Sequence, residues 1–143
     1  MSTIGIIENK ISSIRKYLAL LEDFKKYSQA ELFHDTTISG AFERYLYLVT
    51  QATIELGESY IAHQDFRKPT TMRETFAILR ENGIIEEPLE KKLSDMTGFR
   101  NALAHDYEEL DLLTLYEALH NRLGDIEEFI SIVGKSIKNR QAT

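Results

Sequence analysis

The chain has 143 residues and no cysteine, which excludes disulfide bonds, thiolate metal sites and cysteine nucleophiles. Hydrophobic residues make up 43% of it, but no apolar run approaches the roughly 20 residues of a membrane-spanning helix, and the first residues lack the pattern of a secretory signal. A net charge of −6 argues against broad, non-specific coating of nucleic acid, although one or two arginines can still hold a phosphate. We therefore expect a single cytoplasmic domain over residues 1–143, with no membrane partner.

Two long segments in the first half of the chain have the periodicity of amphipathic helices. Over residues 4–24, apolar side chains recur every three or four positions, which is typical of a helix that buries one face. A second segment begins at residues 35–37 and keeps this periodicity up to Tyr60. Gly40 and Gly57 lie inside it, and each lowers helix propensity by about 1 kcal/mol relative to alanine, so we expect a packing reason for them.

The middle of the chain carries a loop and two shorter predicted helices. Residues 62–70 have the composition of a loop, and the spacing of Thr71 and Glu74 predicts a capping box, in which each side chain bonds a free backbone N–H of the other residue. The helix that follows is expected to end at Asn82–Gly83, because glycine suits the turn after a helix. Another helix begins at residues 86–88, where proline is tolerated and acidic groups favour the positive end of the helix dipole.

The last predicted helix covers residues 112–137 without a break. Its apolar positions alternate in steps of four and three residues, at Leu112, Tyr116, Leu119, Leu123, Ile126, Ile130, Val133 and Ile137. Such spacing is typical of helices that pack in bundles. The sequence therefore predicts an all-α fold, an antiparallel bundle of four to five helices in one domain.

The densest cluster of reactive side chains lies at the end of the fourth predicted helix and contains Arg100, Asn101, His105 and Tyr107. On an unbroken helix Asn101 and His105 share a face, whereas Arg100 and His105 are about 140° apart. For these two groups to meet at one ligand, the last turn must distort or the long arginine side chain must swing across. Beyond the helix, His105 and Tyr107 point to the same side of an extended chain.

These residue types suit the cleavage of RNA. A guanidinium presents paired donors to phosphate oxygens and keeps its charge near pH 7. A histidine that titrates near neutrality can take the proton from a ribose 2′-OH or give one to the departing 5′-oxygen. The 2′-OH then attacks the adjacent phosphate while Arg100 stabilises the added negative charge, so no metal or cofactor is required. Because DNA lacks this nucleophile, we expect selectivity for RNA.

The spacing of Arg100 and His105 alone is also compatible with two surface residues that have no catalytic role. In that interpretation the histidine caps a helix and the arginine pairs with Asp95 or Asp106. A five-residue spacing between two common residue types is a weak motif, so the spacing by itself leaves both interpretations open.

The longer segment around these residues is a more specific motif than the spacing of Arg100 and His105 alone. Residues 96–99, Met-Thr-Gly-Phe, lead into Arg-Asn-x-x-x-His-x-Tyr, and the whole resembles the Arg-x4-His-x-Tyr signature of HepT-like toxins, in the HEPN superfamily of small helical ribonucleases. Residues 68–76, Leu79 and residues 84–85 look like that family's loop and third helix, and residues 107–111 lead into its long last helix. The similarity extends over nearly the full chain.

The resemblance implies a role for each residue of the motif. Arg100 and His105 would be the catalytic pair of a metal-independent endoribonuclease toxin, and Asn101 an active-site polar neighbour. Tyr107 would be adenylylated by a cognate minimal nucleotidyltransferase, the MntA-like antitoxin, which forms a hetero-oligomer with the toxin in a type VII toxin–antitoxin system. Family members are homodimers whose two motifs face a shared cleft. We expect the adenylate to fill that cleft and displace the phosphates of the RNA substrate.

Two other functions remain as alternatives. The first is a non-catalytic binding subunit that supports or presents substrate to a nucleotidyltransferase. The second is a carboxylate-bridged metal site, because Glu31 and Glu117 each precede a histidine by three residues, at His34 and His120. The first pair falls near a helix junction. In the second, Glu117 falls at an outward position and His120 only on the flank, so we expect solvated surface residues there and no metal.

Several aromatic residues lie at helical spacing in the second predicted helix, at Phe42, Tyr45, Tyr47 and Tyr60. Aromatic rings can stack on nucleic-acid bases. At this spacing, however, they are more often core or dimer contacts, and we expect that role for them.

Overall fold

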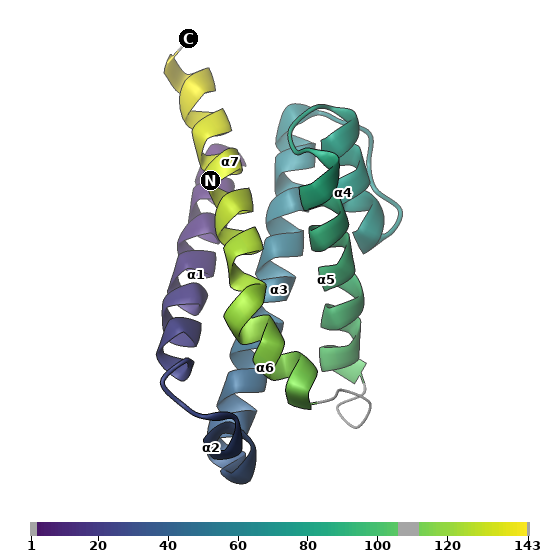
Figure 1. The fold of residues 1–143 in the computed structure, drawn as a ribbon. Helices are drawn as coiled ribbons and strands as arrows, with labels where there is room; N and C mark the ends of the chain where they lie inside the picture. The colour runs from purple at the N-terminus through teal and green to yellow at the C-terminus, as the bar shows by residue number, and fades with distance from the viewer. Residues whose placement is uncertain (1–2, 106–111, 143) are drawn as a thin grey trace.

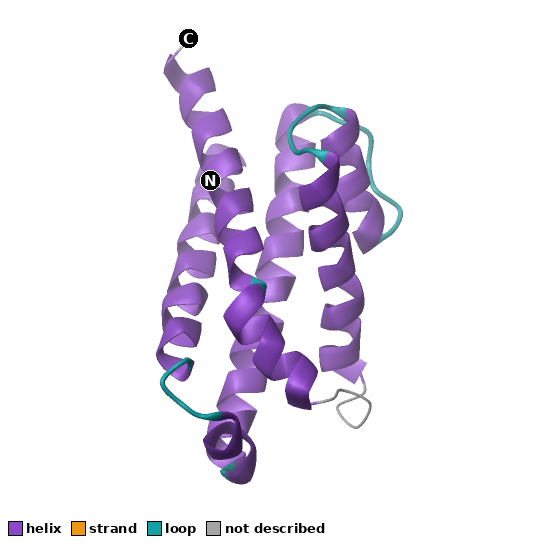
Figure 2. Ribbon diagram, viewed as in Figure 1, coloured by secondary structure: helices purple, strands orange, loops and turns teal. Residues whose placement is uncertain are grey.

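The computed structural model describes residues 3–105 and 112–142. Over these residues the chain forms seven α-helices. Figure 2 shows helices joined by loops, with no strand among the described residues. This confirms the predicted all-α fold, with more helices than the four to five that were expected. The helices are α1 (Thr3–Phe24), α2 (Gln29–His34), α3 (Thr36–Gln64), α4 (Met72–Glu81), α5 (Glu87–His105), α6 (Leu112–Asn121) and α7 (Leu123–Ala142).

The long helices lie side by side as a bundle (Figure 1). Helix α1 packs along α3 and has α7 beside it, while α4 and α5 cover the other side of α3. Helix α6 crosses the bundle near the end where α3 begins. None of the helices in the described part of the chain is both long and apolar enough to cross a lipid bilayer.

Helix α2 was not predicted. It begins at a complete capping box, in which the Ser28 hydroxyl accepts from the backbone N–H of Glu31 at 3.1 Å and the Glu31 carboxylate accepts from the backbone N–H of Ser28 at 2.9 Å. A six-residue helix is too short to show an apolar period, so only this cap signals it in the sequence. The Glu31 carboxylate, which was considered as a metal ligand, is thus bonded to the backbone of Ser28 in this cap.

The predicted last helix is two helices, because the chain turns at Arg122 between α6 and α7. At this turn the backbone N–H of Asp125 bonds the carbonyl of Arg122, a tighter three-residue step than in an α-helix. Gly124, a poor helix former, follows the turn. Leu119, Leu123 and Ile126 are buried on both sides of it, so the apolar period continues through the turn and cannot reveal it.

The loop between α3 and α4 begins later than predicted, because α3 continues to Gln64. The C-cap of α3 is Asp65, which adopts a left-handed conformation with φ of 59°. The predicted capping box at Thr71 is half correct: its hydroxyl accepts from the backbone of Glu74, but the Glu74 carboxylate accepts from Thr70. The predicted stop after α4 is confirmed, since Asn82 is the C-cap and Gly83 has a φ of 71°.

Helix α4 approaches α3 unusually closely. A Cβ at Gly57 would lie 2.8 Å from the methyl carbon of Thr75, which confirms that Gly57 has a packing reason. A Cβ at Gly40 would meet nothing within 4 Å among the described residues, so the same expectation was wrong there. The hydroxyl of Thr75 is fully buried and has no hydrogen-bond partner in residues 3–105 and 112–142.

Candidate active site

Helices α3 and α5 bring together side chains that are about fifty positions apart in the sequence. Arg100, near the end of α5, is half-buried against α3. Its Nε donates to the side-chain oxygen of Gln51 at 2.5 Å, and its Nη2 donates to the hydroxyl of Tyr47 at 3.4 Å. Its Nη1 donates to the side-chain oxygen of Asn101 at 3.0 Å. The guanidinium is therefore held from three directions.

All three partners of the Arg100 guanidinium are neutral. No carboxylate in the described part of the chain forms an ion pair with Arg100, so the alternative in which it pairs with Asp95 is wrong; Asp106 lies outside the described residues. A guanidinium has five N–H donors, and three of them are used here. The described residues leave one N–H on each terminal nitrogen for an anion, which matches the two donors of a bidentate contact with phosphate.

Helix α5 continues without a break to His105, its last residue. The distortion of the last turn that was considered from the sequence therefore does not occur before this residue. Arg100 and His105 are about 140° apart around the helix axis, and Asn101 shares the face of His105. Asn101 is exposed and touches Arg100, so it lies between the two predicted catalytic residues. The side chain of His105 and the whole of Tyr107 lie outside the described residues.

A second arginine, Arg44, which was not predicted from the sequence, belongs to the same surface. The guanidinium carbon of Arg44 lies over the Tyr47 ring at 5.5 Å from its centroid, the same distance as that of Arg100. The available signal was the spacing of Arg44, Tyr47 and Gln51, which places them on one face of α3. Burial raises the pKa of Glu43, the residue before Arg44.

The other aromatic residues singled out from the sequence have the expected core role. Phe42 and Tyr60 are fully buried, and Tyr45 is half-buried with its ring 6.0 Å from that of Phe24. Tyr47 is also half-buried, but its ring lies 5.5 Å from the guanidinium carbons of both arginines. Of the four rings, Tyr47 alone has a described role at the candidate site.

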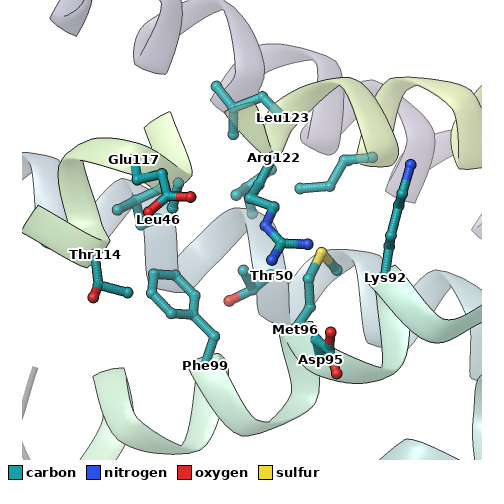
Figure 3. Close-up of a pocket in the computed structure, with 13 residues that line it drawn as sticks. Leu46, Thr50, Lys92, Asp95, Met96, Phe99, Thr114, Glu117, Arg122 and Leu123 are labelled. Carbon is teal, nitrogen blue, oxygen red and sulfur yellow. The ribbon is translucent and has the colours of Figure 1, made fainter. Parts of the chain in front are cut away.

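A pocket of about 180 Å³ opens on a different face of α5, between α3, α6 and α7 (Figure 3). Phe99 lines it, and the Arg122 side chain extends into it between Thr50 and Met96. Its volume is below the roughly 300 Å³ at which ligand pockets begin. Neither Arg100 nor Asn101 lines this pocket, so the candidate site lies outside it, on the surface between α3 and α5.

The metal-site alternative has no support in the described residues. Glu117 lines the pocket of Figure 3, but the ring of His120 packs against Tyr116 with 4.5 Å between centroids. No group of three histidine, aspartate or glutamate side chains in residues 3–105 and 112–142 is arranged to hold a metal ion.

The chain matches a known protein family, and it is the family that the motif around Arg100 resembles. Residues 14–133 match the family described as ribonuclease HepT-like. The chain is a member of the HepT-like ribonuclease family. This confirms the resemblance that was drawn from the segment around Arg100.

Two HepT nucleases are similar to this chain over most of its length. The mRNA nuclease HepT of Shewanella oneidensis is 30% identical over 129 residues, which cover 90% of this chain and 96% of that protein. The tRNA nuclease HepT of Aphanizomenon flos-aquae is 29% identical over 114 residues, which cover 80% of this chain and 78% of that protein.

A solved structure of the family has the same fold. It is the tri-AMPylated Shewanella oneidensis HEPN toxin in complex with an MNT antitoxin, 29% identical to this chain with a TM-score of 0.84. The match covers 94% of this chain and 99% of that toxin. The helical arrangement of this HepT-like chain is thus that of a toxin solved together with its antitoxin.

Proposed function

We propose that this HepT-like chain is an endoribonuclease toxin that cleaves RNA without a metal ion, with Arg100 and His105 as its catalytic residues. The proposal depends on the environment of Arg100. Its half-buried guanidinium is fixed by three neutral groups, and the described residues leave two of its N–H donors for an anion. A preorganised cation of this kind stabilises charge that develops on a phosphate during reaction. The names of the relatives as mRNA and tRNA nucleases support RNA as the substrate.

The proposed reaction uses the nucleophile that RNA itself supplies. The imidazole of His105 accepts the proton of a ribose 2′-OH, and the 2′-oxygen forms a bond to the adjacent phosphorus. Arg100 donates hydrogen bonds to the phosphate oxygens, whose negative charge rises in the transition state. The bond from phosphorus to the 5′-oxygen then breaks, and that oxygen takes up a proton from solvent water. His105 returns the proton that it accepted to solvent, so no net proton is gained or lost. The products are a 2′,3′-cyclic phosphate and a 5′-hydroxyl.

The test is cleavage of several RNAs in EDTA by the wild-type protein, Arg100→Ala and His105→Ala. Arg15→Ala serves as the matched control, because Arg15 is an exposed arginine in the groove between α1 and α7. We expect cleavage with cyclic-phosphate ends by the wild type and the control alone. Equal cleavage by all four proteins, or none by unmodified wild type, would reject the nuclease and favour a non-catalytic binding subunit.

The proposed control of this activity is adenylylation of Tyr107 by a minimal nucleotidyltransferase partner. Support comes from the relative solved as a tri-AMPylated toxin with its MNT antitoxin. An adenylate beside Arg100 brings an anionic phosphate that competes with RNA for the two free N–H donors. After co-expression with the partner, the intact mass is expected to rise by whole adenylates, and Tyr107→Phe is expected to abolish the rise. An unchanged rise in that variant would move the modification to another residue.

We also propose that the active form is a homodimer. The chain carries a net charge of −6, yet its substrate is a polyanion. Two copies of Arg100 in one shared cleft would concentrate positive charge where RNA binds. Sedimentation equilibrium should give twice the mass of the chain, and a monomer that retains full cleavage activity would contradict the proposal.

A further inference from the structure

The surface between α3 and α5 carries a second cation that forms no ion pair with any described residue. We name this surface the α3–α5 patch and define it by five residues: Arg44, Tyr47, Gln51, Arg100 and Asn101. Arg44 is exposed and lies over the Tyr47 ring at 5.5 Å from its centroid. In the described part of the chain it forms no ion pair, whereas Arg67 and Arg80 each pair with a glutamate.

The two arginines of the α3–α5 patch share one aromatic ring. Because each guanidinium carbon lies 5.5 Å from the centroid of Tyr47, the two carbons are separated by at most twice that distance. A ring with a negative face attracts cations and orients them, but it accepts few of their N–H donors. Arg44 therefore keeps donors that an anion can use, close to those that remain on Arg100.

Successive phosphates along one nucleic-acid strand advance by about 3.4 Å along the axis of a stacked helix, so neighbouring phosphates can both be reached by two cations that share one ring. We propose that Arg44 binds a second phosphate of the RNA, next to the one at Arg100, and that Tyr47 is the positioning residue that orients both guanidinium groups. The proposal rests on the proposed function as a ribonuclease. It adds a substrate-binding subsite outside the Arg-x4-His-x-Tyr motif.

The two arginines are expected to affect different kinetic constants. The phosphate at Arg100 gains charge in the transition state, so this contact raises kcat. The phosphate at Arg44 keeps the same charge throughout the reaction. A contact of equal strength in the ground state and in the transition state lowers KM and leaves kcat nearly unaffected.

The binding test uses a fully 2′-O-methylated oligonucleotide, which has no free 2′-OH and cannot be cleaved. Fluorescence anisotropy at increasing KCl gives the slope of log K against log salt for the wild type, Arg44→Gln, Arg44→Lys and the control Arg15→Gln. We expect Arg44→Gln to lower affinity by about tenfold or more and the slope by about 0.7 for each lost contact. Arg44→Lys should keep the slope and lose part of the affinity, because a lysine retains the charge without the planar fork.

The control separates a local contact from a change in net charge, since Arg15→Gln removes the same charge on another face. With cleavable RNA we expect a raised KM for Arg44→Gln and a kcat within about threefold of wild type. Slopes and KM values that match those of Arg15→Gln would overturn the subsite while leaving the ribonuclease intact. Failure of the wild type to bind or cleave any RNA would overturn the subsite together with the proposed function.

Discussion

The Nη2 atom of Arg100 lies 3.4 Å from the hydroxyl oxygen of Tyr47, although the two residues are 53 positions apart in the sequence. The same ring also faces the guanidinium carbon at 5.5 Å. Arg100 is thus fixed by α3 before any substrate arrives. Groups held in place in advance need no reorganisation during reaction, which is the main source of electrostatic stabilisation in enzymes.

The neutral character of the groups around Arg100 gives the first prediction. In Gln51→Glu a carboxylate replaces the amide whose oxygen lies 2.5 Å from Nε of Arg100. The variant should fold at least as well, because it gains a charged hydrogen bond. Its RNA cleavage should fall by at least about tenfold, because the new ion pair weakens the attraction of Arg100 for phosphate.

A matched control for this variant is Gln29→Glu, which adds the same charge at an exposed residue of α2. Cleavage rates and urea midpoints of both variants and the wild type are the measurements. If Gln51→Glu cleaves RNA at the rate of Gln29→Glu, the neutrality of the Arg100 partners has no functional importance.

The ring and the hydroxyl of Tyr47 can be separated by two substitutions. Tyr47→Phe keeps the ring over which both arginines lie and removes only the long hydrogen bond to Arg100. We expect it to lower cleavage by about twofold to threefold, since a neutral hydrogen bond contributes about 0.5–1.5 kcal/mol and this one is stretched. Tyr47→Leu removes the cation–π contacts as well, and we expect a loss of about tenfold or more. Equal activity of the two variants would show that the ring does not position the guanidinium groups.

Much of the fold could be predicted from local pattern. The apolar period of α1 and the glycine at Gly83 each reflect interactions within a few residues of one another. Helix α2 and the turn at Arg122 were missed, because one is shorter than the window that shows a period and the other leaves the period intact. Local sequence thus predicts where long helices form more reliably than where they break.

The candidate site, like the fold, could be predicted from the sequence only in part. Arg100 and Asn101 are adjacent in one motif, so the sequence alone identifies them together. Gln51, Tyr47 and Arg44 join them only because α3 and α5 pack in one particular register. That register depends on the packing of the whole bundle, and no short sequence pattern encodes it.

The buried hydroxyl of Thr75 gives a prediction about stability. It has no hydrogen-bond partner among the described residues, so Thr75→Val should raise the free energy of unfolding by about 1 kcal/mol. Thr53→Val is the matched control, because Thr53 is equally buried but its hydroxyl donates to the carbonyl of Val49 at 2.7 Å. We expect the control to be neutral or destabilising. Urea unfolding compares the two, and equal changes would contradict the assignment of an unpaired hydroxyl.

The close approach of α3 and α4 gives a second stability prediction. In Gly57→Ala the added methyl would lie 2.8 Å from the Thr75 methyl carbon, and this overlap should cost about 1–3 kcal/mol, more than the gain of about 1 kcal/mol in helix propensity. Thr75→Ser removes the opposing methyl, so the double variant should recover most of the loss. Gly40→Ala is the control, since its methyl meets nothing within 4 Å in the described residues and should stabilise α3. A double variant no more stable than Gly57→Ala would exclude steric overlap as the cause.

The loop before α4 is held by Arg67, which donates to Glu81 at 2.7 Å and to Glu74 at 2.8 Å. The hydrogen bond from Arg67 holds the pKa of Glu81 below its ordinary value. A carboxyl whose pKa is lowered on folding stabilises the native state above its unfolded pKa and loses this effect as the pH falls through the folded pKa. Arg67→Gln should therefore lower the urea midpoint slightly at neutral pH, and the difference from wild type should shrink below about pH 4.5.

High salt should reduce the same difference, because exposed charges are screened. Arg73→Gln is the matched control: Arg73 is an exposed arginine of α4 that forms no ion pair within residues 3–105 and 112–142. Urea midpoints at about pH 7, 5 and 3 for the wild type and both variants provide the comparison. A deficit of Arg67→Gln that persists unchanged at the lowest pH would mean that packing of the arginine side chain, rather than its pairing with Glu81 and Glu74, holds the loop.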